Sequence, residues 1–160
     1  MHAGLSDSGA DAVEELFGHL ASDDASREDV TEALRSLRLT ADDVGGCSPY
    51  QPGHRVRCEL ARTKAWVLLA LLWDRTTTSI HDHCESECGF RIVEGEIEET
   101  RFRCDGDQAH PISTHKLMPG DFVTTPGSTV HQLGTKGRAI SIHAYAPALC
   151  LDDMQVFERA

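Results

Sequence analysis

The sequence predicts an all-β core, a sandwich or barrel, preceded by two amphipathic α-helices. From about residue 56 to residue 157, short apolar stretches alternate with turn residues, which is typical of antiparallel sheets. Before them, apolar residues recur at helical spacing in two segments. A chain of 160 residues favours one domain, which we divide into a helical segment over residues 1–43 and a β-barrel over residues 54–160.

The first helix is expected over residues 10–22 and the second directly after Ser26, whose hydroxyl can cap it. Apolar residues at helical spacing in the first segment are Val13, Leu16, Phe17 and Leu20. Those in the second are Val30, Ala33, Leu34 and Leu37. We expect both helices to pack their apolar faces on a sheet. Glycines and prolines over residues 44–53 then predict a loop.

Ten strands are expected after this loop. They span residues 56–61, 65–73, 79–83, 90–94, 96–103, 114–118, 121–125, 130–133, 140–145 and 154–158. Turns are marked by glycine beside aspartate or proline, at Asp105-Gly106-Asp107, Pro119-Gly120 and Pro126-Gly127. Strands this short, joined by tight turns, favour a sandwich or barrel over a parallel sheet.

The charge balance argues against two classes of partner. Fifteen lysines and arginines face 26 aspartates and glutamates, and the net charge of -11 opposes binding to nucleic acid or to anionic membranes. The N-terminal residues offer neither a basic segment nor a long apolar stretch, as a signal peptide or membrane span would. We therefore expect a cytoplasmic monomer.

Two histidines two residues apart are the main functional signal. His81 and His83 follow an apolar run, and residues i and i+2 of a strand share a face, so both imidazoles can bind one metal ion. The best third ligand is His131, at the end of a strand-turn-strand unit. A site with three protein ligands leaves coordination positions open to substrate, and imidazole suits iron, zinc or nickel.

The six cysteines offer a different metal site. Cys84 and Cys88 are four residues apart and close to histidines, so a zinc knuckle has to be considered. No second close pair of cysteine or histidine residues completes four ligands, and a strand explains the segment better. We expect free thiols.

The histidine segments resemble the two motifs of the cupins. The first motif is matched by His81, His83 and Gly95, with Arg75 in place of its leading glycine. The second is matched by Gly120, Pro126 and His131, and differs at Ser128 and Thr135. The resemblance implies a cupin jelly-roll, a β-sandwich or barrel that holds the metal inside.

Cys88 makes the resemblance specific to one branch of the cupins. It stands where cupins carry a glutamate ligand, and without that carboxylate an Fe(II) centre keeps its 2+ charge and better accepts an anionic thiolate. This resembles the thiol dioxygenases, specifically the cysteine dioxygenases, in some of which a cysteine at this place is linked to a tyrosine. The segment Ser141-Ile142-His143-Ala144-Tyr145 resembles their Ser-x-His-x-Tyr, so Cys88 and Tyr145 form the candidate thioether pair. Ser141 would orient His143, and His143 the Tyr145 hydroxyl.

Arg57 is the expected ligand of the substrate carboxylate. Arg57-Cys58-Glu59-Leu60 resembles the arginine segment of the family, with Arg55 and Arg62 as alternatives. Each proposed role has an ordinary structural explanation as well: Cys88 as a small buried residue, Tyr145 as a core aromatic residue, and Arg57 as a surface charge.

The resemblance implies oxidation of L-cysteine by O2 to cysteine sulfinic acid at an Fe(II) site. Two other functions stay open. One is a dioxygenase for another small thiol, such as 3-mercaptopropionate, homocysteine or an N-terminal cysteine. The other is a non-catalytic cupin that only binds a metal or a small ligand.

Overall fold

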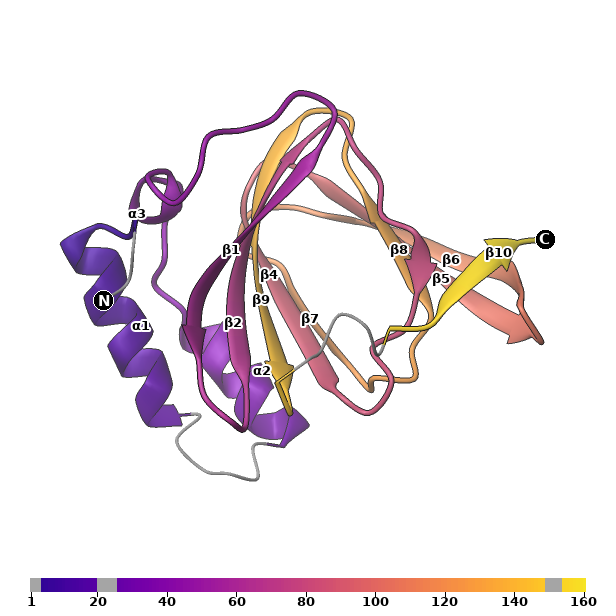
Figure 1. Cartoon of the computed structure of the whole chain (residues 1–160), viewed down its shortest axis with the longest axis horizontal. Coiled ribbons are helices and arrows are strands. Elements are labelled where there is room, and N and C mark those ends of the chain that lie inside the picture. Colours follow the sequence, from indigo (N-terminus) through magenta and orange to yellow (C-terminus); the bar gives the residue numbers. More distant parts are fainter. Residues whose placement is uncertain (1–3, 20–25, 149–153) are drawn as a thin grey trace.

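Two β-sheets face each other, and three helices lie against the outer face of one of them (Figure 1). The computed structural model describes residues 4–19, 26–148 and 154–160. The predicted all-β core with preceding helices is confirmed. None of the described helices is long and apolar enough to cross a membrane.

The helices begin at polar caps. Helix α1 (Asp7–His19) starts three residues before the expected position, and residues 20–22 of the expected helix lie outside the described residues. Helix α2 (Arg27–Ser36) starts after Ser26, whose hydroxyl accepts a hydrogen bond from the third residue of the helix. Helix α3 (Ala41–Val44) was not expected, because a helix of one turn has no apolar repeat to detect.

The first sheet lies between the helices and the interior. Its strands, in hydrogen-bonded order, are β1 (Arg55–Arg62), β2 (Val67–Asp74), β9 (Arg138–Ala146), β4 (Glu87–Glu94) and β7 (Phe122–Thr125). Every residue of β2 is buried, because Leu68 and Leu72 pack with the helices while Leu69 and Leu71 face the second sheet. Burial on both faces explains why this strand is a continuous apolar run.

The second sheet closes on itself. Its strands are β10 (Val156–Arg159), β3 (Ile80–His81), β8 (His131–Gly134), β5 (Ile97–Asp105) and β6 (Gln108–Leu117). Closure comes from β10, which pairs antiparallel with β3 and parallel with β6. This leaves the inner faces of the two sheets opposite each other, with the candidate site between them.

Most strand ends lie one or two residues from the predicted positions, and the differences in β3, β4 and β6 have consequences. Strand β4 begins at Glu87 instead of residue 90, so Cys88 lies inside it, and β3 ends at His81, so His83 follows the strand. Strand β6 starts six residues before the expected position. The sequence did not predict this half of β6 because it contains Pro111, and proline is uncommon inside strands. A register shift next to Phe102 accommodates the proline.

Candidate metal centre

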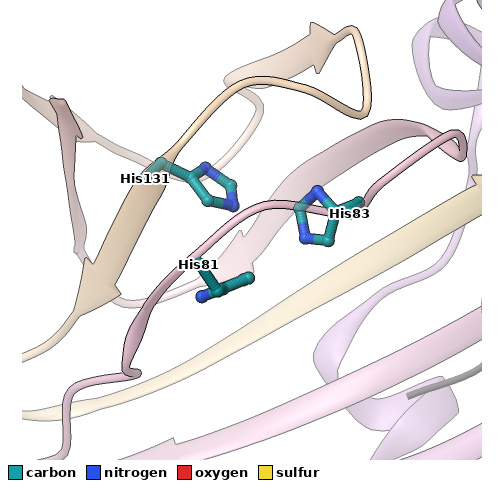
Figure 2. A group of neighbouring side chains, drawn as sticks. All are labelled: His81, His83 and His131. Carbon is teal, nitrogen blue, oxygen red and sulfur yellow. The ribbon is translucent and has the colours of Figure 1, made fainter. Parts of the chain in front are cut away.

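Three histidines converge between the sheets. His81 and His131 are opposite residues of the paired strands β3 and β8, and His83 follows β3 (Figure 2). One nitrogen from each ring can be chosen so that all lie within 4.8 Å of one another, and the ring centres are 5.0 Å apart in each pair. This is the set of three that the sequence predicted.

A close approach of two loops fixes His83. Its backbone N–H donates to the carbonyl oxygen of Gly127 at 2.8 Å. A Cβ at Gly127 would overlap the carbonyl of Cys84 and lie 2.6 Å from that of Ser86. Only glycine lets these loops meet without displacement, so Gly127 permits the close packing in which the His83 backbone is hydrogen-bonded.

The other two rings are oriented through their Nδ1 atoms. His81 Nδ1 lies 2.9 Å from the Ser79 carbonyl oxygen, and His131 Nδ1 lies 2.9 Å from Oε1 of the buried Glu99. Since both partners accept hydrogen bonds, each Nδ1 carries the proton and each Nε2 is left with a free lone pair. Partners of this kind commonly orient histidines that bind metals.

Glu99 was not predicted from the sequence. Its second oxygen accepts from Arg101 Nε at 3.2 Å. Burial raises the pKa of Glu99, but its hydrogen bond and charge interaction with His131, together with those of Arg101, outweigh burial and leave this pKa below the ordinary value. A charged carboxylate therefore lies behind His131, separated from the expected metal position only by the His131 ring.

The donor set fits a metal ion. Nδ1 of His83 and Nε2 of His131 are buried and have no hydrogen-bond partner among the described residues, which is uncommon for buried polar atoms. Burial, and then the neighbouring histidines, lower the pKa of His81 to about 4 and that of His83 to about 2. At neutral pH these rings are neutral, the form that binds metals.

Cys88 and Tyr145 face the histidines from the first sheet. They are directly opposite on the paired strands β4 and β9, both are buried, and their hydroxyl and thiol are in hydrogen-bond contact. Burial raises the pKa of both groups, so both are protonated at neutral pH. The Tyr145 ring centre lies 5.1 Å from that of His83.

A chain of buried hydrogen bonds supports Tyr145. Trp73 Nε1 donates to Ser141 Oγ at 2.9 Å, and Ser141 Oγ lies 2.8 Å from His143 Nε2. His143 Nδ1 is 3.3 Å from the Tyr145 hydroxyl. Burial holds the pKa of His143 well below its ordinary value, so the ring is neutral and can accept at Nε2 and donate at Nδ1. Trp73, at the start of this chain, was not predicted.

Two of the three arginines considered from the sequence reach the site. A small pocket is lined by Arg55, Arg57, Leu69, Leu71, His81 and Tyr145, together with Met154. Arg55 is half-buried, with its guanidinium carbon 5.3 Å from the centre of the Trp73 ring. Arg62 forms an exposed ion pair with Glu59 at 2.9 Å and does not line the pocket.

One family matches nearly the whole chain. The sequence model described as "Cysteine dioxygenase type I" matches residues 6–160. The match includes the three histidines, the strands that carry Cys88 and Tyr145, and the helical segment.

Solved structures resemble the fold. A protein from Klebsiella pneumoniae with a double-stranded β-helix domain is 16% identical, with a TM-score of 0.55 over 70% of this chain and 91% of that one. A cupin superfamily protein from Desulfitobacterium hafniense is 17% identical, with a TM-score of 0.52 over 62% and 83%. An RmlC-like cupin from Desulfovibrio desulfuricans is 18% identical, with a TM-score of 0.53 over 64% and 91%. They confirm the predicted cupin fold.

Proposed function

The chain belongs to the cysteine dioxygenase type I family, and on this premise we propose that it oxidises L-cysteine with O2 to cysteine sulfinic acid. One thiol and one O2 molecule give one sulfinic acid, with both oxygen atoms on sulfur, so no further reductant is needed. The observation that carries the proposal is a set of three buried histidines opposite a buried cysteine and tyrosine. This arrangement suits a metal that must take a thiol and O2 together.

The proposed metal is Fe(II), bound by His81, His83 and His131. Such an ion supplies activation of O2 and lowers the pKa of a bound thiol. The protein contributes three neutral donors, and Glu99 is the only carboxylate among the described residues that touches them. A site with neutral ligands favours an anionic substrate.

Arg57 is proposed to hold the substrate carboxylate. It lines the same pocket as His81 and Tyr145, and a guanidinium pairs with a carboxylate through two parallel hydrogen bonds. Leu69 and Leu71 form an apolar wall of this pocket. A pocket with a cation beside the metal site and an apolar wall selects a short thiol that carries a carboxylate.

Tyr145 is proposed to donate its O–H to the bound substrate or oxygen. His143 Nδ1–H can donate to the hydroxyl oxygen, so the Tyr145 proton is available either to the Cys88 thiol or to a substrate bound in the pocket. Ser141 and His143 act by orienting this hydroxyl.

A thioether between Cys88 Sγ and a ring carbon of Tyr145 would fix the ring further. Its formation removes the thiol hydrogen and one ring hydrogen, and the two electrons pass to O2, which becomes hydrogen peroxide. Mass spectrometry of the linked peptides tests this step, because the cross-linked pair is lighter by two hydrogen atoms.

Oxygen uptake by iron-loaded protein tests the function. L-cysteine, 3-mercaptopropionate, homocysteine and cysteamine are compared, and the sulfinate formed is measured by NMR. We expect L-cysteine to be preferred, with one sulfinate for each O2 consumed. Preference for a thiol without a carboxylate would contradict the role of Arg57. If no thiol is consumed although iron is bound, the protein is a non-catalytic metal-binding cupin.

A further inference from the structure

Two arginines line the pocket beside the metal site, Arg55 half-buried and Arg57 exposed. Arg55 and Arg57 occupy alternate positions of β1 and therefore lie on the same face of the strand. Opposite them in β2 stand Trp73 and Leu71. No carboxylate occurs among the described residues that line this pocket, and no ion pair joins either arginine to another described residue.

The positive charges of Arg55 and Arg57 therefore lie close together, with no carboxylate among the described residues that line the pocket. Burial, followed by repulsion from Arg57, lowers the pKa of Arg55. The Trp73 ring stabilises the Arg55 guanidinium through a cation–π contact at 5.3 Å. A half-buried cation fixed in this way is arranged to meet an anion in the pocket.

One substrate carboxylate neutralises only one of these two cations. A bound divalent metal adds further positive charge, while Glu99 on the other side is already paired with Arg101. An ammonium group near Arg55 would be repelled, whereas a second carboxylate at the same place would be attracted. The charge balance of the pocket therefore favours a substrate with more than one acidic group.

We propose that the pocket takes small thiols that carry two carboxylates, the first bound by Arg57 and the second by Arg55. The inference rests on the proposed thiol dioxygenase function and widens its substrate class beyond L-cysteine. It assigns Arg55 as the residue that distinguishes thiols with two carboxylates from thiols with one.

A matched pair of thiols tests the proposal. Mercaptosuccinate differs from 3-mercaptopropionate by one carboxylate on the carbon that carries sulfur. Calorimetry on iron-loaded protein without O2 gives both dissociation constants in the absence of turnover. We expect mercaptosuccinate to bind about 10-fold to 100-fold more tightly, which is the size of one charged hydrogen-bonded contact. Equal affinities would overturn the proposal.

Variants assign the effect to one residue. Arg55→Gln should weaken mercaptosuccinate binding about 10-fold or more and 3-mercaptopropionate binding less than about threefold. Arg55→Lys keeps the charge and should retain most of the preference, and Arg62→Gln changes an exposed arginine outside the pocket and should have no effect. An equal loss for both thiols in Arg55→Gln would place both guanidiniums on one carboxylate and refute the proposal.

Oxygen uptake then separates this inference from the proposed function. The ratio of kcat/KM for the two thiols should follow the ratio of their affinities. If neither these two thiols nor L-cysteine is oxidised but mercaptosuccinate still binds more tightly through Arg55, the dioxygenase proposal fails and the assignment of Arg55 stands. If both are oxidised without preference, the assignment fails and the dioxygenase stands.

Discussion

The inner faces of the two sheets hold their site residues in different ways. On the second sheet, His81 and His131 are held by strong acceptors, the Ser79 carbonyl and the Glu99 carboxylate. On the first sheet, Tyr145 is held by a chain of neutral groups that begins at Trp73. We call the face with His81, His83 and His131 the histidine wall and the face with Tyr145 and His143 the tyrosine wall. The histidine wall keeps the metal-binding nitrogens of His81 and His131 basic, and the tyrosine wall keeps one hydroxyl in position.

This difference predicts that the two walls control separable properties. Changes on the histidine wall should alter metal affinity, because acceptors at Nδ1 make the metal-binding nitrogen more basic. Changes on the tyrosine wall should alter turnover and stability while the metal stays bound. The following variants test that separation.

Loss of His131 should have the largest effect. His131→Ala removes one of three nitrogen donors. Loss of a group that only hydrogen-bonds a metal ligand lowers metal affinity by up to about 100-fold, so loss of a ligand itself should lower iron content and oxygen uptake by more than about 100-fold. Iron is measured by plasma emission spectroscopy on the purified protein. His110→Ala, at an exposed position of β6, is the control. An active His131→Ala protein that retains iron would remove His131 from the ligand set.

Glu99→Gln tests whether the charge of the carboxylate that holds His131 contributes to metal affinity. The amide oxygen can still accept from His131 Nδ1, so the ring stays oriented while the negative charge is lost. We expect metal affinity to fall about 10-fold to 100-fold, measured by competition with a chelator. Glu98→Gln, at the exposed neighbouring position, should leave the affinity unchanged. An unchanged affinity in Glu99→Gln would show that the carboxylate does not tune the site.

The sequence predicted the histidine wall better than its support. His81 and His83 are two residues apart, and His131 ends a recognisable strand-turn-strand unit, so local patterns identify all three. Glu99 lies in β5, and no spacing relates it to His131 before the register of β5 and β8 is known. The structural partner of a ligand is therefore harder to predict than the ligand itself.

The same limit applies to the tyrosine wall and to the fold. Alternation in β9 places Ser141, His143 and Tyr145 on one face, but the contact with Trp73 depends on pairing between β2 and β9. Periodicity predicted the longer helices and most strands. It missed α3, which is too short to repeat, and the first half of β6, where Pro111 breaks the pattern.

Ser141→Ala tests the tyrosine wall. It leaves the buried Trp73 Nε1 without an acceptor and His143 Nε2 without a donor, so we expect a loss of about 1–3 kcal/mol in the free energy of unfolding. The Tyr145 hydroxyl also becomes less fixed, and kcat should fall while iron content stays at the wild-type level. Urea unfolding and iron analysis measure the two effects, with Ser113→Ala on β6 as control. Loss of iron in Ser141→Ala would contradict the separation of the walls.

The smallest predicted effect is the pH dependence of stability in metal-free protein. Burial lowers the pKa of His81 from 6.5 to about 4, so between these values the unfolded chain binds a proton that the folded chain does not. The free energy of unfolding must therefore fall as the pH decreases from about 6.5, by up to about 1.4 kcal/mol per pH unit for this one group.

His81→Gln removes this contribution and should flatten the slope of the free energy of unfolding against pH, measured by urea unfolding between about pH 7 and pH 5. His110→Gln, which changes an exposed histidine, should keep the wild-type slope. Burial also lowers the pKa of the neighbouring His83. Any slope that remains in His81→Gln therefore comes from His83 and the other titrating groups. An unchanged slope in His81→Gln would mean that the fold does not keep this ring neutral in the metal-free protein.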